Sequence, residues 1–323
     1  GRRDIPAVDL NLQTHSGTVD FLFDSNDQLE IQTGILFRFQ DNFANPETGV
    51  RRIIPDYQRV DLGFFTTGVY ELSDRVELDF GIRYDYNHYD VKKFYQISRW
   101  EALGYDALFS DLIIGQESSQ YLTNPVLNFH NIAVSAGVKA EVSDESSLLF
   151  NYTLSSRPPN VSELFSDGLH HSAARIELGD LRLNSETSHR ISASFLGETE
   201  NLSWQLDAYS NQIQDYIYIV PSGTQQTIRG AFPVWSYKQA NALFFGFDAW
   251  AKISLSNKWN YSINSSYIYA EDLDNKEGII DIPPFQVRNK ISYYNEDWHQ
   301  FSSNIVSEFV GRQTRFPVAL NQL

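Results

Sequence analysis

Residues 76–87, VELDFGIRYDYN, alternate apolar and polar side chains over a length that few strands of soluble proteins reach. The apolar set is Val76, Leu78, Phe80, Ile82, Tyr84 and Tyr86. The polar set is Glu77, Asp79, Arg83, Asp85 and Asn87. Because successive side chains of a β-strand point to opposite faces, this pattern predicts a long strand between an apolar and an aqueous environment.

The same alternation recurs along the whole chain and marks twelve candidate strands. We expect them at residues 8–23, 29–40, 58–71, 76–91, 127–142, 147–156, 187–197, 202–219, 238–255, 259–271, 286–294 and 298–310. In the first of these strands the alternation changes phase near Gly17, where we expect a β-bulge.

The connections between these strands alternate strictly between short and long. Short polar turns are expected at 24–27, 73–74, 143–145, 197–200, 256–258 and 295–297, and long connections at 41–57, 92–126, 157–186, 220–237 and 272–285. Transmembrane barrels have short periplasmic turns and long extracellular loops. The sequence therefore predicts an all-β fold, a transmembrane antiparallel β-barrel forming one domain over residues 1–323. A large soluble all-β protein is the alternative.

The composition excludes several classes of function. A net charge of -16 argues against a nucleic-acid partner, because phosphate binding needs clustered Lys and Arg. The chain has no cysteine and no phosphate-binding loop, nucleophile elbow or nicotinamide-type glycine motif, so we expect no enzyme, no catalytic residues, no metal site and no cofactor. No apolar run approaches the roughly 18 residues of a transmembrane helix, whereas barrel strands turn only alternate residues toward lipid.

One segment carries a more specific signal. Residues 151–188 read NYTLSSRPPNVSELFSDGLHHSAARIELGDLRLNSETS, and residues 228–242 read IRGAFPVWSYKQANA. A late Ile282-Pro283-Pro284-Phe285 stretch follows. Together these motifs resemble the C-terminal part of the barrel of TonB-dependent receptors, the gated outer-membrane transporters of Gram-negative bacteria.

The resemblance implies a barrel of 22 strands that encloses an N-terminal plug domain with a TonB-binding box. This sequence shows about twelve strands and neither plug nor box, and its polar start, Gly1-Arg2-Arg3-Asp4, contains no signal peptide. We therefore interpret it as a partial barrel, a processed or truncated piece of a longer receptor.

The function implied by the resemblance is active import of a scarce ligand across the outer membrane, with iron–siderophore, haem or another metal chelate as the expected cargo. The implied partners are this small-molecule ligand, the TonB complex acting through the plug, outer-membrane lipids and a surface lipoprotein. A passive porin-like barrel, or a structural or adhesin barrel, is the alternative.

Five residues of the long connections are candidates for ligand contact: His170, His171, Glu163, Trp100 and Tyr105. Imidazole and carboxylate groups together suit metal or haem iron, and aromatic rings could stack on a chelate. Packing within the loops is the alternative for all five.

Arg157 and Glu186 stand at the two ends of the 157–186 connection. Their strands are expected to be neighbours, so we expect the two side chains to pair and to fix the base of the loop. Direct ligand contact is the alternative for this pair.

Overall fold

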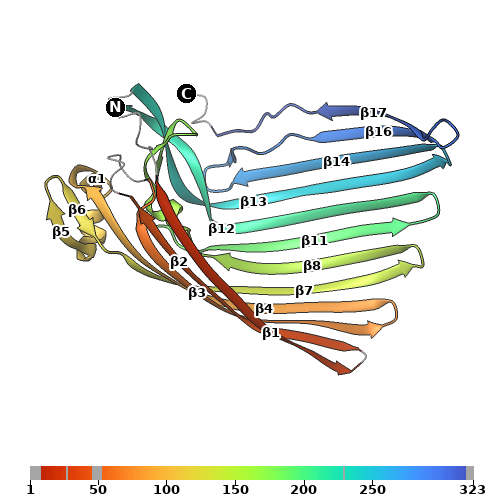
Figure 1. Ribbon diagram of the computed structural model, residues 1–323, viewed down its shortest axis with the longest axis horizontal. Coiled ribbons are helices and arrows are strands. Elements are labelled where there is room, and N and C mark those ends of the chain that lie inside the picture. Colours follow the sequence, from red (N-terminus) through yellow and green to blue (C-terminus); the bar gives the residue numbers. More distant parts are fainter. Residues whose placement is uncertain (1–8, 27, 46–52, 228–229, 318–323) are drawn as a thin grey trace.

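The computed structural model describes residues 9–26, 28–45, 53–227 and 230–317. Over these residues twelve long strands follow one another in an antiparallel sheet, each paired with the next (Figure 1). They are β1 (Leu10–Asn26), β2 (Leu29–Ala44), β3 (Asp56–Ser73), β4 (Val76–Gln96), β7 (Val126–Ser143), β8 (Ser146–Arg157), β11 (Glu186–Glu198), β12 (Leu202–Thr227), β13 (Gly230–Ser256), β14 (Trp259–Asp272), β16 (Gln286–Asn295) and β17 (Phe301–Val310). The predicted number of long strands is confirmed.

The shorter elements lie within the long connections. They are α1 (Ile97–Ala102), α2 (Tyr105–Leu108), a 3-10 helix (Ser110–Leu112), β5 (Ile113–Glu117), β6 (Gln120–Thr123), α3 (Val161–Phe165), β9 (Asp167–His170), β10 (Arg175–Leu178) and β15 (Glu277–Gly278). Figure 1 shows α1, β5 and β6 of the 92–126 connection at the left end of the sheet and the short turns at the right end. None of the described helices has the length and apolar character needed to cross a bilayer.

Several predicted strand ends are wrong. β4 runs on to Gln96, and β12 and β13 continue as one hairpin through most of the predicted 220–237 connection. Ladder hydrogen bonds and side-chain contacts such as Ser222 to Ser236 hold this hairpin together, and Val220 and Val234 are buried in it. Part of the 41–57 connection, the Ile228-Arg229 pair and the predicted strand start at residue 8 lie outside the described residues.

The predicted bulge near Gly17 is also wrong. β1 and β2 pair in continuous register from Leu10 opposite Ala44 to Asp24 opposite Glu30, and the shift comes only at the turn. The phase change has another cause. β1 is a regular strand whose apolar side chains lie mostly on one face before Gly17 and mostly on the opposite face beyond it, so the alternation changes phase without a bulge.

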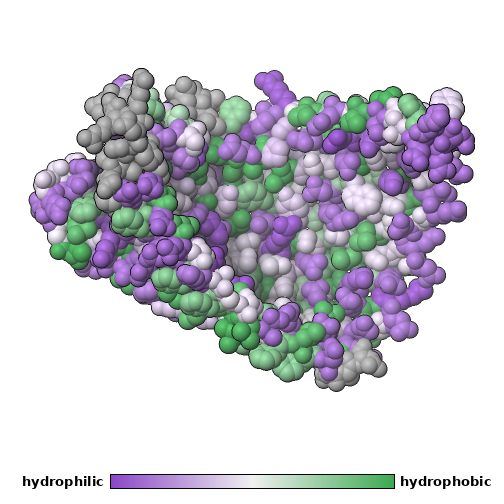
Figure 2. Space-filling view, viewed as in Figure 1, coloured by the Kyte–Doolittle hydropathy of each residue, from purple (hydrophilic) through white to green (hydrophobic). Residues whose placement is uncertain are grey.

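The two faces of the sheet differ in chemistry. On the outer face Phe64 lies between Ile35 and Tyr84 on the neighbouring strands, and all three side chains are exposed. On the other face, Asp61 lies between Arg38 and Asn87. Soluble monomers rarely expose a continuous apolar face of this kind, whereas barrel walls turn one to lipid. Figure 2 shows hydrophilic residues gathered at the end that carries the short turns.

The sheet is open over the described residues. β1 pairs with β2 and β17 pairs with β16, and β1 does not pair with β17 within the part of the chain that the structure describes. These twelve strands therefore form a curved wall and not a closed ring. The main buried core is not between layers of the wall but among the long connections at one end.

Candidate functional site

The base of the 157–186 connection begins where β8 stops pairing, at Pro158 and Pro159, because proline cannot donate to a strand ladder. Asn160 then caps helix α3: its Oδ1 accepts from the Glu163 backbone N–H at 2.9 Å. In return the Asn160 backbone N–H donates to Glu163 Oε2 at 2.7 Å. This reciprocal cap fixes the position of the Glu163 carboxylate.

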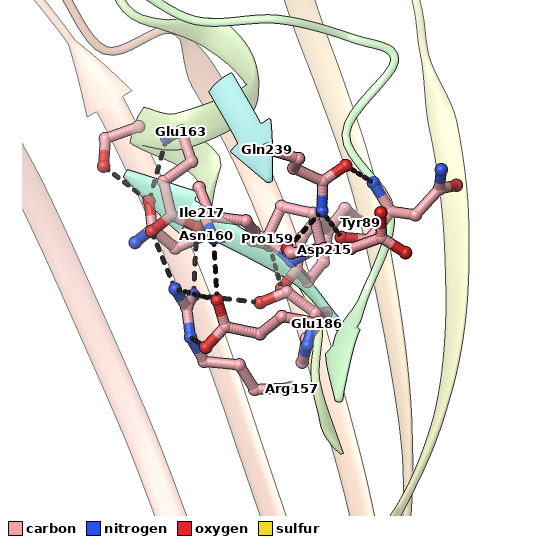
Figure 3. A network of polar contacts seen from close by, with 12 residues as sticks. Tyr89, Arg157, Pro159, Asn160, Glu163, Glu186, Asp215, Ile217 and Gln239 are labelled. Atoms are coloured by element: carbon pink, nitrogen blue, oxygen red, sulfur yellow. Dashed lines mark hydrogen bonds and ion pairs between the residues drawn. The ribbon is translucent and has the colours of Figure 1, made fainter. Parts of the chain in front are cut away.

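Arg157 lies between two carboxylates (Figure 3). Its Nη1 and Nη2 donate to Glu163 at 3.0 and 3.1 Å, and its Nε and Nη2 donate to Glu186 at 2.8 and 3.2 Å. Both carboxylates are mostly buried. The structure thus brings Arg157 and Glu186 together across neighbouring strand ends, and it adds Glu163 to the pair.

Glu186 also reaches a third strand. Its Oε2 accepts from the Ile217 backbone N–H at 3.0 Å, just beyond an irregularity in β12 where Asp215 has φ 53°. Gln239 Nε2 braces this point by donating to the Asp215 carbonyl at 2.7 Å and to the Asn184 carbonyl at 2.9 Å (Figure 3). Gln239 lies within the 228–242 motif but was not predicted as a site residue. The one sequence feature that fits the irregularity is Asp215 itself, because Asp tolerates a positive φ.

Gly179 explains why the return of the loop packs so tightly on α3. Its backbone N–H donates to the Ser166 carbonyl at 2.7 Å. A Cβ at this position would lie 2.5 Å from the carbonyl carbon of Leu164, a backbone atom that cannot move aside. Only glycine therefore permits this approach.

The 92–126 connection packs onto this base through a buried aromatic cluster. Trp100 and Tyr105 are essentially inaccessible to solvent and meet edge to face with ring centroids 5.2 Å apart. Tyr105 donates its hydroxyl to Asp180 Oδ1 at 3.0 Å and accepts from the Leu181 backbone N–H at 2.9 Å. Burial raises the pKa of Tyr105, so the hydroxyl remains a neutral donor at physiological pH.

Buried charges form a second connection between the two segments. Lys93 Nζ donates to the Phe165 carbonyl at 2.6 Å and lies 3.7 Å from Asp167 Oδ2. Arg99 Nη1 lies 3.0 Å from Asp167 Oδ1. Removing one partner of a buried ion pair is strongly destabilising, so these charges hold the 92–126 connection in place on the loop base.

The acid response of this packing can be predicted from Asp180. Burial raises its pKa, but hydrogen bonds from Arg182 and Tyr105 outweigh burial and hold the pKa below its ordinary value. A carboxylate with a lowered folded pKa stabilises the fold above its unfolded pKa, about 3.9, and loses that contribution as the pH falls through the folded value. We expect hydrogen exchange in residues 92–126, corrected for intrinsic rates, to be constant from about pH 8 to about pH 5 and faster below about pH 4.

The matched variant is Asp180→Asn, which accepts from Tyr105 but has no carboxylate to protonate. We expect it to reduce the extra exchange in acid. An unchanged acid dependence in this variant would show that another group controls the loop.

The two histidines lie beyond this base. His170 Nδ1 lies 2.8 Å from Glu177 Oε1, which also accepts from Arg175 Nε at 2.8 Å. These residues belong to the β9–β10 hairpin, which pairs in parallel with β13. His171 Nε2 is buried without a hydrogen-bond partner in the described part of the chain. No group of three His, Asp or Glu suited to a metal ion occurs among the described residues.

The predicted ligand-contact residues thus occupy different environments. Trp100, Tyr105 and Glu163 are buried in the packing of the loops, whereas the His170 side chain is about half exposed. The ligand-contact role of these residues stays a prediction.

Comparison with known proteins adds the family context. Residues 3–322 match the family model described as TonB dependent receptor-like, beta-barrel. No curated protein matches the sequence. Among solved structures, the copper transporter OprC superposes with a TM-score of 0.73 at 15% identity, over 95% of this chain and 44% of that one.

Two further similar structures are an iron transporter and a hemophore receptor. The FrpB iron transporter from Neisseria meningitidis (F3-3 variant) gives a TM-score of 0.61 at 12% identity, over 93% of this chain and 43% of that one. The Serratia marcescens hemophore receptor HasR, in complex with its hemophore HasA and heme, gives a TM-score of 0.62 at 11% identity, over 95% of this chain and 52% of that one. The chain thus spans about half the length of these proteins or less, and the likeness concerns the fold.

Proposed function

Because this chain belongs to the TonB-dependent receptor β-barrel family, we propose that it forms part of the wall and the ligand-facing loops of a receptor that actively imports a scarce ligand across the Gram-negative outer membrane. The family match over residues 3–322 carries this proposal. The apolar outer face is suited to lipid, and the polar inner face to an aqueous lumen. The energy would come from the TonB complex.

The loop end supports a role in ligand capture. The 92–126 and 157–186 connections are joined by the Tyr105–Asp180 hydrogen bond and the Lys93–Asp167 ion pair. Such rigid loops can hold contact groups in place, and a preorganised site saves the entropy of ordering them on binding. We propose the exposed side of this block, including His170, as a contact region.

The chemistry of the chain favours a chelated ligand over a bare soft metal ion. The sequence contains neither Cys nor Met, so this chain cannot supply the sulfur ligands that select copper(I). Arginine, tyrosine and tryptophan side chains instead suit an anionic or aromatic chelate. We therefore propose an iron–siderophore, haem or another metal chelate as cargo.

The test is uptake by cells that produce the complete receptor. Iron-55-labelled ferric siderophores, haem and copper(II) would be offered one at a time, with and without a protonophore. We expect cells to accumulate one chelate only while the inner-membrane proton gradient persists. The alternative is a passive porin-like barrel. It would be established if the protonophore did not reduce uptake and if the purified protein showed a large steady conductance in planar bilayers.

A further inference from the structure

The segment that follows β17 lies against the connection between β14 and β16. The Gly311 backbone N–H donates to the Phe285 carbonyl at 2.8 Å. Gln313 Nε2 donates to the Ile282 carbonyl at 2.5 Å, and Gln313 Oε1 accepts from the Arg315 backbone N–H at 2.9 Å. The backbone of Arg315 is therefore fixed relative to the wall.

The Arg315 side chain stacks on Tyr269, and this ring belongs to the outer face of the wall. The guanidinium carbon lies 3.8 Å from the ring centroid. Strand register establishes the face, because residues that pair on neighbouring strands share one face of a sheet. A row of paired residues crosses the wall to Tyr269 from Phe80, which lies on the outer face with Tyr84. The row is Phe80, Ala136, Tyr152, Ile191, Ser210, Phe245 and Tyr269. Arg315 is thus an outer-face arginine.

Tyr269 also marks the loop-side border of the apolar surface of β14. On the outer face the residues from Trp259 to Tyr269 are aromatic or aliphatic except Ser265, and the next residue on this face is Glu271. Trp259 and Tyr269 are ten positions apart, about 33 Å along a strand and about 23 Å in height at a tilt of about 45°. This height agrees with the apolar band of transmembrane barrels, about 25 Å. Arg315 therefore stands at the level of lipid headgroups.

A small cavity beside Arg315 combines positive charge with an apolar lining. It encloses about 120 Å³, and Arg312 and Phe285 also line it, but no Asp or Glu does. Neither arginine forms an ion pair within the part of the chain that the structure describes. Glu271 accepts from the Tyr269 hydroxyl instead. In a chain of net charge -16, two arginines without a carboxylate partner identify a place for an anion.

We propose that this cavity, the Arg315–Tyr269 pocket, binds the phosphate headgroup of a lipid in the outer leaflet. A guanidinium fork matches phosphate oxygens bidentately, and the tyrosine ring holds the fork in place. Gly278 permits this arrangement, because an added Cβ would lie 2.9 Å from the carbonyl carbon of Arg315. The proposal goes beyond ligand import and requires only that the outer face meets lipid.

The surface on the turn side of the pocket is suited to acyl chains. Phe247 and Phe285 lie next to each other there, with ring centroids 6.5 Å apart. Farther toward the turns, Phe309 pairs with Val287, which in turn pairs with Ser265 of the outer face. Phe309 is 60% exposed. A lipid would cover these apolar side chains while its phosphate meets the arginine, whereas a soluble anion would leave them uncovered.

The experiment is native mass spectrometry of the complete receptor, delipidated in detergent, with dioleoyl phosphatidic acid as the probe. Dioleoyl phosphatidylcholine has the same acyl chains, but choline covers its phosphate, so it is the matched probe. We expect the first phosphatidic acid to bind more tightly than phosphatidylcholine. Arg315→Gln should weaken phosphatidic acid binding about tenfold, the loss of about one charge-assisted hydrogen bond, and leave phosphatidylcholine binding unchanged. Arg315→Lys, which keeps the charge without the fork, should lie between.

The matched control is Arg190→Gln. Arg190 also stacks on a tyrosine, with its guanidinium carbon 4.5 Å from the Tyr209 ring centroid, but it lies on the inner face, next in sequence to Ile191 of the outer face. The affinity of this variant for both lipids should equal that of the unsubstituted receptor. Equal losses in Arg190→Gln and Arg315→Gln would indicate a general effect of charge and would overturn the pocket.

Three further results would overturn the proposal. Equal binding of the two lipids would mean that the pocket does not recognise phosphate. Displacement of phosphatidic acid by inorganic phosphate at equal concentration would assign the pocket to a free anion. An Arg315→Gln receptor that binds both lipids normally but unfolds at a lower temperature would assign the stack to packing of the segment after β17. None of these results bears on energised uptake, so the test is independent of the import function.

Discussion

Replacing Arg157 with leucine is expected to produce one of the two largest losses of stability, about 2–4 kcal/mol at the base of the 157–186 connection. The substitution leaves Glu163 and Glu186 facing each other without a cation, in positions where both are mostly buried. A fully buried pair would cost about 3–5 kcal/mol, and the value here is lower because the Arg157 side chain is 42% exposed.

The measurement is hydrogen exchange of residues 157–186 in the complete receptor, together with urea unfolding in detergent. Faster exchange should reach the Ile217 amide, because Glu186 accepts from it. Arg75→Leu is the matched control: Arg75 pairs with Asp144 at 2.6 Å between two turns, but the side chains are 60% and 87% exposed. An exposed pair contributes about 0–1 kcal/mol, so equal effects of the two substitutions would contradict our account of the loop base.

The strands of the wall could be predicted from the sequence because each of them lies between two different environments. Phe64 points to the outer face and Asp61 to the inner face, so the alternation of apolar and polar residues predicts the direction of each side chain. The ends of β12 and β13 could not be predicted in this way. Beyond residue 219 only scattered side chains such as Val220 and Val234 are buried, so the hairpin shows no apolar and polar alternation, although backbone pairing continues there.

The contacts of the candidate site could be predicted only between residues that are close in sequence or that stand at the ends of neighbouring strands. Arg157 and Glu186 meet because β8 and β11 pair in register up to these two residues. The Lys93 and Asp167 pair joins segments more than seventy positions apart, and no local pattern fixes how two long connections pack.

Trp100→Ala is expected to cost about 3–5 kcal/mol of local stability in the 92–126 connection. Trp100 is fully buried, and its ring lies 5.2 Å from Tyr95 and Tyr105 and 6.2 Å from Tyr121, measured between centroids. Its indole Nε1 has no hydrogen-bond partner among the described residues. The loss therefore reflects a cavity and lost ring contacts.

The readout is hydrogen exchange along residues 92–126 and at Leu181, whose amide donates to Tyr105. The matched control is Trp298→Ala, since Trp298 stands 64% exposed at the turn before β17 and should change stability by less than about 1 kcal/mol. If Trp100→Ala speeds exchange in 92–126 but not at Leu181, the two connections move independently. The rigid block proposed for ligand capture would then be wrong, because Tyr105 is the point where the aromatic cluster meets the loop base.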